Sequence, residues 1–169
     1  MAKYTANELA DWLFEKAQEA KNPQTARKHV MSMDQRGRVT TMLGRLYFYK
    51  YNPLYGDKMT KYDKFPLCVP IERYNNGFLG VNLHYLPAAS RSVLLEIMLQ
   101  TKSEQTVTDD TIMRINYQRL KAVQRVFSLA QPCIHRYVFN QVRSKFIEIY
   151  PREFDRAIQL PVDDWVFNQ

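Results

Sequence analysis

The stretch that most restricts the fold is FPLCVPIERYNNGFLGVNLHYLP, residues 65–87. Within it, Asn76-Gly77 favours a tight turn, because both residues tolerate positive φ. Apolar residues alternate after this turn, as is typical of a strand with one buried face. The segment before the turn carries Pro66 and Pro70, which cannot donate ladder hydrogen bonds, so this strand must be an edge strand or bent. We therefore expect a β-hairpin here.

A further strand signal precedes the hairpin. RLYFYKY, residues 45–51, alternates between two faces, one of which carries three tyrosines. Together with the hairpin, this strand predicts a small antiparallel sheet over residues 45–86, either open or curled like a barrel. Gly80 in the second hairpin strand indicates a bulge or a close approach of another backbone.

Helical patterns flank this sheet on both sides. Thr5-Ala-Asn-Glu8 has the composition of a capping box and predicts an N-terminal helix within residues 1–22. After the hairpin, apolar residues recur at helical spacing in a long helix that begins at Thr108 and in a second helix over residues 132–150. We therefore predict an α+β fold with an N-terminal helix, a small antiparallel sheet and a C-terminal helical bundle.

The length of 169 residues suits one domain, 1–169, with a sizeable core. Its expected parts are the N-terminal helix, a basic connecting segment, the sheet, a helical part and a docking tail, at residues 1–22, 23–44, 45–86, 87–159 and 160–169. The connecting segment could be a short helix and a loop, or an arm that becomes ordered on a partner. The acidic tail carries two large aromatic residues, so we expect it to dock on its own body or on a neighbour.

Positive charge is concentrated in one part of the chain. The net charge is +7, and residues 21–64 contain ten Lys or Arg against three Asp. Such asymmetry indicates contact with an anionic partner, either nucleic acid or an acidic protein surface, and the alternative is a solvated basic loop. The candidate residues for this contact are Arg27, Lys28, Arg36, Arg38, Arg45 and Lys50.

Aromatic side chains suggest a second contact surface. A stiff sheet loses little side-chain entropy on docking, and aromatic anchors often dominate protein interfaces. The tyrosine-rich face of the first strand could also stack bases, although such a face more often packs in a core or against protein. The candidate partner-binding residues are Tyr47, Tyr49, Phe78, Tyr85, Trp165 and Phe167.

The sequence contains little that could carry catalysis. Cys68 and His84 fall on paired strands and form the one conceivable nucleophile and base, but the residues beside the thiol favour plain packing. Cys133 and His135 lack the second pair of ligands that a zinc site needs. Motifs for phosphate-binding loops and for nucleophilic serines are absent. We expect no enzyme, no catalytic residue, no metal, no cofactor and no small-molecule substrate.

The chain also has no apolar run of membrane-spanning length, and its N-terminus lacks the apolar core of a secretory signal. Two cysteines make no disulfide framework and fit a reducing compartment. We expect no membrane partner and a protein produced in a cytoplasm.

Three strings within residues 44–87 are distinctive: YFYKYNP, YDKFPL and GFLGVNLHYLP. In this order they resemble a pattern in small virion proteins of T-even-like tailed phages, over about a quarter of the chain. Such proteins include DNA end protectors, head-completion proteins, and tail or baseplate components. The resemblance implies a virion protein that is assembled in the host cytoplasm and is not an enzyme.

Two functions are consistent with these features. In the first, the protein is a rigid adaptor that docks on other virion proteins of the tail, baseplate or neck through its aromatic and basic residues. In the second, it is a sequence-independent double-stranded DNA-binding protein that guards genome ends during packaging or head completion, with its basic residues on phosphates. Steep salt dependence of binding to linear duplex would favour the second function.

Overall fold

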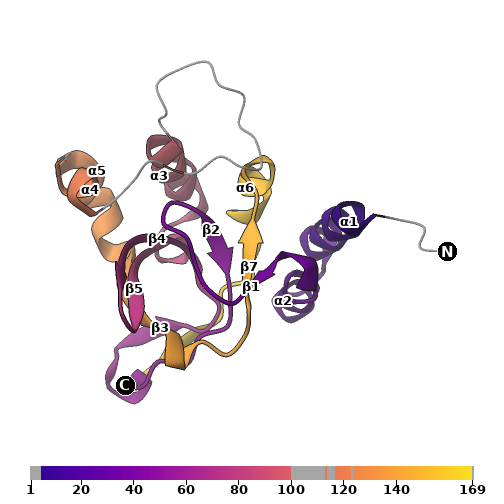
Figure 1. Cartoon of the computed structure of the whole chain (residues 1–169), viewed down its shortest axis with the longest axis horizontal. Coiled ribbons are helices and arrows are strands. Elements are labelled where there is room, and N and C mark those ends of the chain that lie inside the picture. The colour runs from indigo at the N-terminus through magenta and orange to yellow at the C-terminus, as the bar shows by residue number, and fades with distance from the viewer. Residues whose placement is uncertain (1–4, 100–112, 114–116, 123, 169) are drawn as a thin grey trace.

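The computed structural model describes residues 5–99, 113, 117–122 and 124–168 (Figure 1). Its central element is a six-stranded antiparallel sheet with the strand order β1-β7-β2-β4-β5-β6. These strands are Gly37–Arg38 (β1), Leu46–Phe48 (β2), Leu67–Tyr74 (β4), Gly77–Asn82 (β5), Ile134–Val138 (β6) and Phe146–Ile149 (β7). A separate pair of antiparallel strands joins Lys61–Asp63 (β3) to Trp165–Phe167 (β8).

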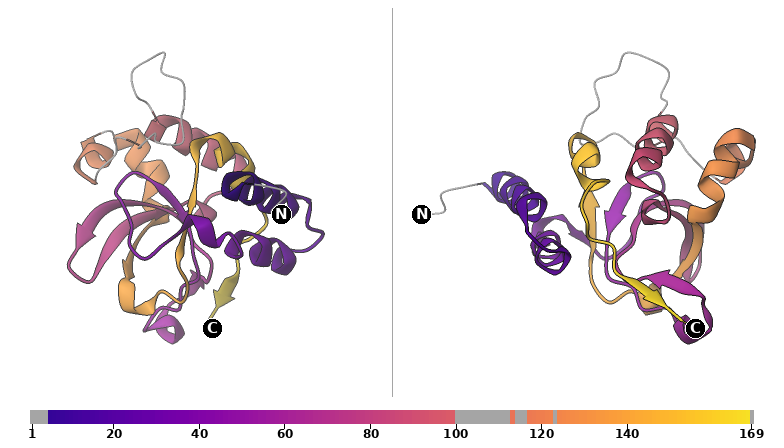
Figure 2. Two further views of the ribbon diagram at one scale, coloured as in Figure 1. Left: turned by 45° about the vertical axis from the view of Figure 1, so that its right-hand side comes forward. Right: turned by 180° about the vertical axis from the view of Figure 1, so that it is seen from behind.

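The α-helices lie in two groups around this sheet. They are Ala6–Glu19 (α1), Pro23–Met31 (α2), Ala88–Leu99 (α3), Tyr117–Ala122 (α4), Gln124–Ala130 (α5) and Phe154–Ala157 (α6). Short 3-10 turns occupy Asp34–Arg36, Gly56–Lys58, Leu83–Tyr85, Gln131–Cys133, Phe139–Gln141 and Pro151–Glu153. Figures 1 and 2 show α3 to α6 at one end of the sheet, β3 and β8 at the other end, and α1 beside α2 next to β1.

The predicted α+β class is confirmed, and β4 and β5 form the expected hairpin. Its turn residues are Asn75 and Asn76, one position earlier than predicted, because Gly77 is already the first residue of β5. β4 is not an edge strand, since β2 and β5 flank it. It is bent instead: the register shifts between Pro70 and Glu72, where the proline lacks its N–H.

Close packing explains both glycines of the hairpin. A Cβ atom at Gly77 would lie 1.9 Å from the carbonyl oxygen of Tyr137 on the neighbouring strand β6. At Gly80, a Cβ would lie 2.3 Å from the Cys68 sulfur, so the close neighbour is a side chain and not the expected backbone. Neither position has room for a larger residue without movement of its neighbours.

The expected helix over residues 132–150 is wrong, because this region contains strands β6 and β7. Its apolar residues Ile134, Val138, Val142 and Phe146 are four apart, a spacing that keeps one face in a helix and also in a strand of period two. β6 extends the sheet beside β5, and β7 fills the position between β1 and β2. The C-terminal bundle is correspondingly smaller than predicted. α4 and α5 fall within the other predicted helix, whose expected start at Thr108 lies outside the described residues.

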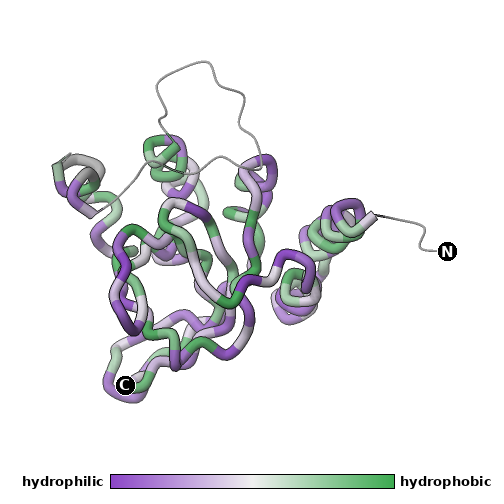
Figure 3. The backbone as a smooth tube through the Cα atoms, in the orientation of Figure 1, coloured by the Kyte–Doolittle hydropathy of each residue, from purple (hydrophilic) through white to green (hydrophobic). Residues whose placement is uncertain are grey.

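The sheet is strongly curled but open. In the described part of the chain, its edge strands β1 and β6 do not pair with each other, so the barrel alternative is not realised. Hydrophobic and hydrophilic residues alternate around the curl (Figure 3). As a result, Leu46 and Phe48 of β2 pack in a large core against the helices, while Tyr47 of β2 and Tyr49 directly after it pack in a second, aromatic core.

Local chemistry sets the start of both N-terminal helices. Thr5 and Glu8 form the capping box of α1, with each side chain bonded to the other residue's backbone N–H. The Asn22 side chain caps α2, and Pro23 occupies its first turn. The basic connecting segment is therefore a helix followed by a 3-10 turn, β1 and a loop.

Candidate nucleic-acid interface

A hollow of about 460 Å³ lies between α2 and the segments that connect the strands of the sheet. Residues from five separated parts of the chain line it: Gln24, Arg27, Lys28, Met31, Lys50, Phe65, Ser144 and Asp164. We call this feature the basic hollow. The fold thereby brings together three of the six predicted anion contacts, two from α2 and one that follows β2.

An aromatic ring forms part of the hollow and lies between two of its cations. The guanidinium carbon of Arg27 is 5.3 Å from the centre of the Phe65 ring, and the Lys50 ammonium is 6.0 Å from it. Arg27 also donates to the Asp163 carbonyl at 3.2 Å, and the Lys50 backbone N–H donates to the Ser144 hydroxyl at 2.8 Å. These contacts fix the positions of two positive groups beside an apolar surface.

Positive charge exceeds negative charge in the hollow. Asp164 is the one carboxylate in its lining, 4.0 Å from Arg27. Lys28 and Lys50 are exposed, and in the ranges that the structure describes no carboxylate forms an ion pair with either. Two lysines without acidic partners beside an arginine form a surface suited to phosphate groups.

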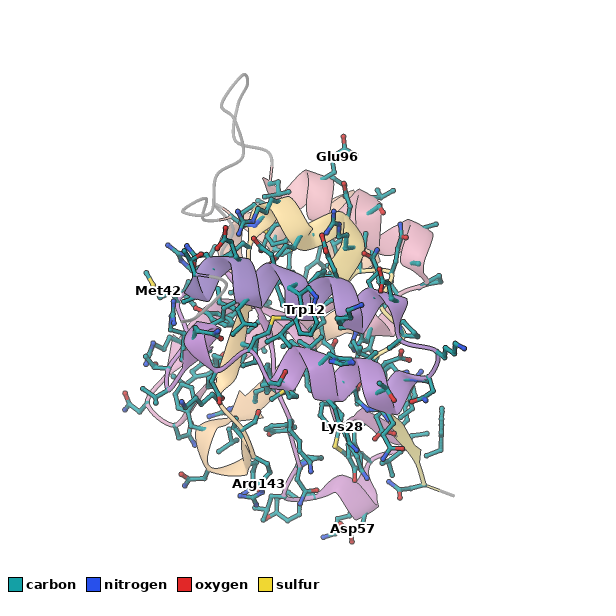
Figure 4. The ribbon with its side chains drawn as sticks, turned by 90° about the vertical axis from the view of Figure 1, so that its right-hand side faces the viewer. Trp12, Lys28, Met42, Asp57, Glu96 and Arg143 are labelled. Atoms are coloured by element: carbon teal, nitrogen blue, oxygen red, sulfur yellow. The ribbon has the colours of Figure 1, made fainter. Side chains whose placement is uncertain are left out.

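The positive surface continues beyond the hollow. Arg143 is exposed, and its backbone N–H donates to the Lys50 carbonyl at 2.8 Å. Lys145 is also exposed, and its side chain packs over Gly37 of β1. Figure 4 shows Lys28 and Arg143 on the same face of the molecule. The helix expected over residues 132–150 gave no sign that residues 143–145 lie beside Lys50.

Arg36 is not a surface contact, contrary to our prediction, because its side chain is only 2% exposed. Its guanidinium pairs with Glu153 at 2.5 Å and with Asp11 at 3.0 Å, and lies 4.2 Å from the Tyr150 ring. Arg152 pairs with the same Asp11 at 2.9 Å. We call these five residues the Arg36 cluster. They join α1, the 3-10 turn before β1 and the segment before α6, which is a structural role.

Arg38 and Arg45 share a single carboxylate. Glu148 on β7 is buried and accepts from Arg45 at 2.7 Å, with Arg38 at 3.5 Å on its other oxygen. The side chain of Arg38 is 45% exposed, and that of Arg45 is largely covered. Two guanidiniums against one carboxylate leave an excess of positive charge at the end of β1.

Three of the predicted aromatic anchors cannot meet a partner in this fold, which corrects the expectation of an aromatic docking face. Tyr47, Tyr49 and Phe78 are each at most 2% exposed. They pack against one another and against Tyr137 and Phe146, with ring centres such as those of Tyr49 and Phe146 4.8 Å apart. Burial of their large rings stabilises the curl of the sheet.

The other three anchors lie near the tail. Trp165 packs edge-on against Tyr85 at 4.7 Å, and Lys61 lies over both rings. Tyr85 also stacks on His135 at 4.1 Å, a contact that sequence reasoning missed because it placed His135 in a helix. Phe167 is 71% exposed. The tail thus docks on its own body through β8 while this one ring remains outside.

The conceivable catalytic pair is fully enclosed. Burial raises the pKa of the Cys68 thiol, which lies beside the Tyr49 hydroxyl, and burial raises the pKa of Cys133 to about 12. His84 is also buried, with Nδ1 2.6 Å from the Asp63 carboxylate. These positions suit packing and buried hydrogen bonding, since a nucleophilic cysteine needs an accessible thiolate.

Asp63 organises the region in front of the tail. Burial favours a higher pKa for this carboxyl, but His84 and hydrogen bonds from Phe65 and Asn82 outweigh that effect, so the pKa is lower than the ordinary value of 3.8. The same carboxylate also accepts from the backbone N–H of Asp164. It therefore joins β3, the hairpin and the chain that leads into β8.

The described residues offer neither a metal site nor a membrane span. No group of three or more His, Cys, Asp or Glu side chains there could hold a metal ion. No helix among them has the length and apolar character needed to cross a membrane.

The curled sheet and the basic hollow define an α+β protein with positive charge gathered on one part of its surface. A family model described as "Phage T4 terminal DNA protecting protein" matches residues 10–169, and the chain belongs to this family. The resemblance to T-even-like phage proteins is thereby confirmed, within its DNA end protector type. Searches of curated proteins and of solved structures gave no match.

Proposed function

We propose that this protein binds the double-stranded ends of a phage genome and shields them, acting by binding and without catalysis. The description of the family supports this role over that of a tail or baseplate adaptor. The observation in the structure that carries it is the basic hollow, where Lys28 and Lys50 are exposed and have no acidic partner among the described residues. The burial of three expected docking aromatics removes much of the support for the adaptor reading.

The contacts would be to the backbone of the DNA, irrespective of base sequence. Lys28 and Arg143 lie on one face (Figure 4), and Lys50 lines the hollow with Lys28 and is hydrogen-bonded to Arg143. Their ammonium and guanidinium groups can pair with phosphates, which every sequence carries. The protein would act in the host cytoplasm during packaging and remain with the DNA in the virion.

Salt-dependent binding tests this role. Affinity of the full chain for a short linear duplex is measured by fluorescence anisotropy over a range of salt concentrations. We expect affinity to fall steeply with salt, and Lys28→Ala/Lys50→Ala to reduce the slope of log affinity against log salt by about 2. Lys121→Ala/Arg136→Ala removes the same charge from α4 and the opposite sheet edge, and is the matched control.

Protection is then measured directly. Linear duplex is incubated with a double-strand exonuclease in the presence of each variant. The wild type and the control should slow degradation, and Lys28→Ala/Lys50→Ala should protect poorly at salt concentrations where its binding is lost. Absence of binding by the wild type at low salt would remove the proposal.

A second role, docking on other virion proteins, is supported by one observation: Phe167 is 71% exposed at the edge of β8. Phe167→Ser should leave the fold and DNA binding intact and lower the amount of protein found in purified particles. Normal incorporation would exclude Phe167 as the docking residue.

A further inference from the structure

The loop between β1 and β2 exposes apolar side chains to an unusual degree. Val39 is 88% exposed, Met42 52% and Leu43 41%, whereas Thr41 between them is buried. Apolar side chains do not pair with phosphates, so three of them close together on the surface are suited to an apolar contact. We call Val39, Met42 and Leu43 the apolar tip.

Hydrogen bonds from the body of the protein hold this loop in place. Arg73 on β4 donates to the Thr41 carbonyl at 2.8 Å and to the Thr40 hydroxyl at 2.9 Å. The Met42 backbone N–H donates to the Tyr47 hydroxyl at 2.9 Å. Gly44, at φ 79°, closes the loop with its N–H on the Pro70 carbonyl. The apolar tip is therefore presented in a fixed conformation, so little entropy is lost when it meets a partner.

Arginines lie beside the tip. Arg73 bonds the loop directly, and Arg38 and Arg45 are the arginines that flank the loop in sequence. Glu148 is the carboxylate that pairs with two of them. An apolar surface with a cationic rim is complementary to a partner with an apolar face and an anionic rim.

The tip is connected to the basic hollow along the sheet edge. Lys145 packs over Gly37, and Arg38 pairs with Phe146 in the β1–β7 ladder. Arg143 is hydrogen-bonded to Lys50, and Lys145 contacts β1. These two exposed cations therefore link the hollow to the sheet edge. In Figure 4, Met42 projects at the edge of the face that carries Lys28 and Arg143.

A duplex end has the complementary chemistry. Its last base pair exposes a flat apolar face that the next pair would cover in the interior of the duplex, and phosphates surround that face. Apolar side chains such as Leu and Met make comparable contacts where they insert between base steps. We propose that the apolar tip covers the terminal base pair while the basic hollow holds the adjoining backbone. This inference rests on the proposed function and adds the feature that distinguishes an end from the interior of the duplex.

Two duplexes of the same sequence test the cap: one with blunt ends, and one closed at both ends by hairpin loops. Wild type should bind the blunt duplex more tightly than the closed one. Val39→Ser/Met42→Ser/Leu43→Ser should lose roughly tenfold in affinity for the blunt duplex and little for the closed one, because base stacking is lost and phosphate contacts remain. Leu54→Ser/Val93→Ser removes two other exposed apolar residues and should behave as wild type.

A fluorescent base analogue, 2-aminopurine, reports on the position of the contact. With the analogue in the last base pair, wild type should change its emission more than the triple variant does, and with the analogue in the centre of the duplex neither should change it. Circular dichroism establishes that each variant is folded, and Met42→Glu provides a single exposed substitution if the triple variant is not. The Met42→Glu variant should lose the preference for blunt ends as well.

The outcomes separate the two proposals. If wild type binds neither duplex at low salt, both proposals fail. If it binds both duplexes equally, or if the triple variant keeps the preference for open ends, the cap is overturned and backbone binding stands. If a triple variant that keeps the preference for open ends is also missing from purified particles, the tip contacts a protein partner and not the DNA end.

Discussion

The basic hollow and the Arg36 cluster use the same kind of side chain in opposite ways. Lys28 and Arg36 come from one basic stretch of sequence, yet Arg36 is enclosed by two carboxylates and a tyrosine ring. Lys28 is exposed and has no acidic partner in the part of the chain that the structure describes. A buried cation with matched partners stabilises the fold, and an exposed cation without partners is available to an anion outside it. The local count of acidic partners therefore distinguishes structural from binding residues here.

Arg36→Ala should have the largest effect on stability. It leaves the buried Glu153 without its cation, and loss of one partner of such a pair costs about 3–5 kcal/mol. Urea unfolding of the variant and the wild type measures the difference. The DNA affinity of the folded fraction should be unchanged. If the Arg36→Ala variant is stable and loses DNA binding, Arg36 is a DNA contact and not a structural residue.

Asp63→Asn should have the next largest effect, about 1.5–3 kcal/mol at neutral pH, because the carboxylate accepts several hydrogen bonds in the interior. Since the folded pKa of Asp63 lies below 3.8, its ionised form stabilises the protein above that pH. This contribution is lost as the pH falls through the lower folded value. The stabilities of variant and wild type, measured from pH 7 to pH 2, should therefore converge at the acidic end.

Trp165→Ala tests a contact of intermediate burial. The ring packs edge-on against Tyr85 and lies under Lys61, so we expect a loss of about 1.5 kcal/mol with the body of the protein still folded. Thermal unfolding monitored by circular dichroism measures this loss. No change in stability would mean that the tail is held by β8 pairing alone.

Lys28→Ala/Lys50→Ala should have the smallest effect on stability, within about 0.5 kcal/mol, since neither side chain has an acidic partner in the described residues. Its effect should appear in the salt dependence of DNA binding. Urea unfolding of this variant and of the wild type measures the change in stability. A marked destabilisation would show that these lysines hold the hollow together, and would remove the distinction between the two regions.

Local signals in the sequence were sufficient for part of the fold. The capping box of α1 and the hairpin turn depend on neighbouring residues, so they could be predicted to within a residue or two. The strands β6 and β7 could not, because apolar residues four apart fit a helix and a strand equally well. Their assignment depends on sheet partners that are distant in sequence.

The site was predictable only in part for the same reason. Composition located the basic stretch, but it could not distinguish Lys28 from Arg36, since Asp11 and Glu153 become neighbours of Arg36 only in the folded chain. Likewise, Phe65 and Ser144 carry no sequence signal for an anion site. They join Arg27 and Lys50 because the sheet places their segments side by side.

The enclosure of both cysteines has a practical consequence for following this protein on DNA. Cys68 and Cys133 are buried with raised pKa values, so maleimide dyes should leave them unmodified in the native state. A cysteine introduced at an exposed position such as 121 would then be the single labelled thiol. Energy transfer from that dye to one on a DNA strand would report where the protein sits along a duplex, without removal of any native residue from the core.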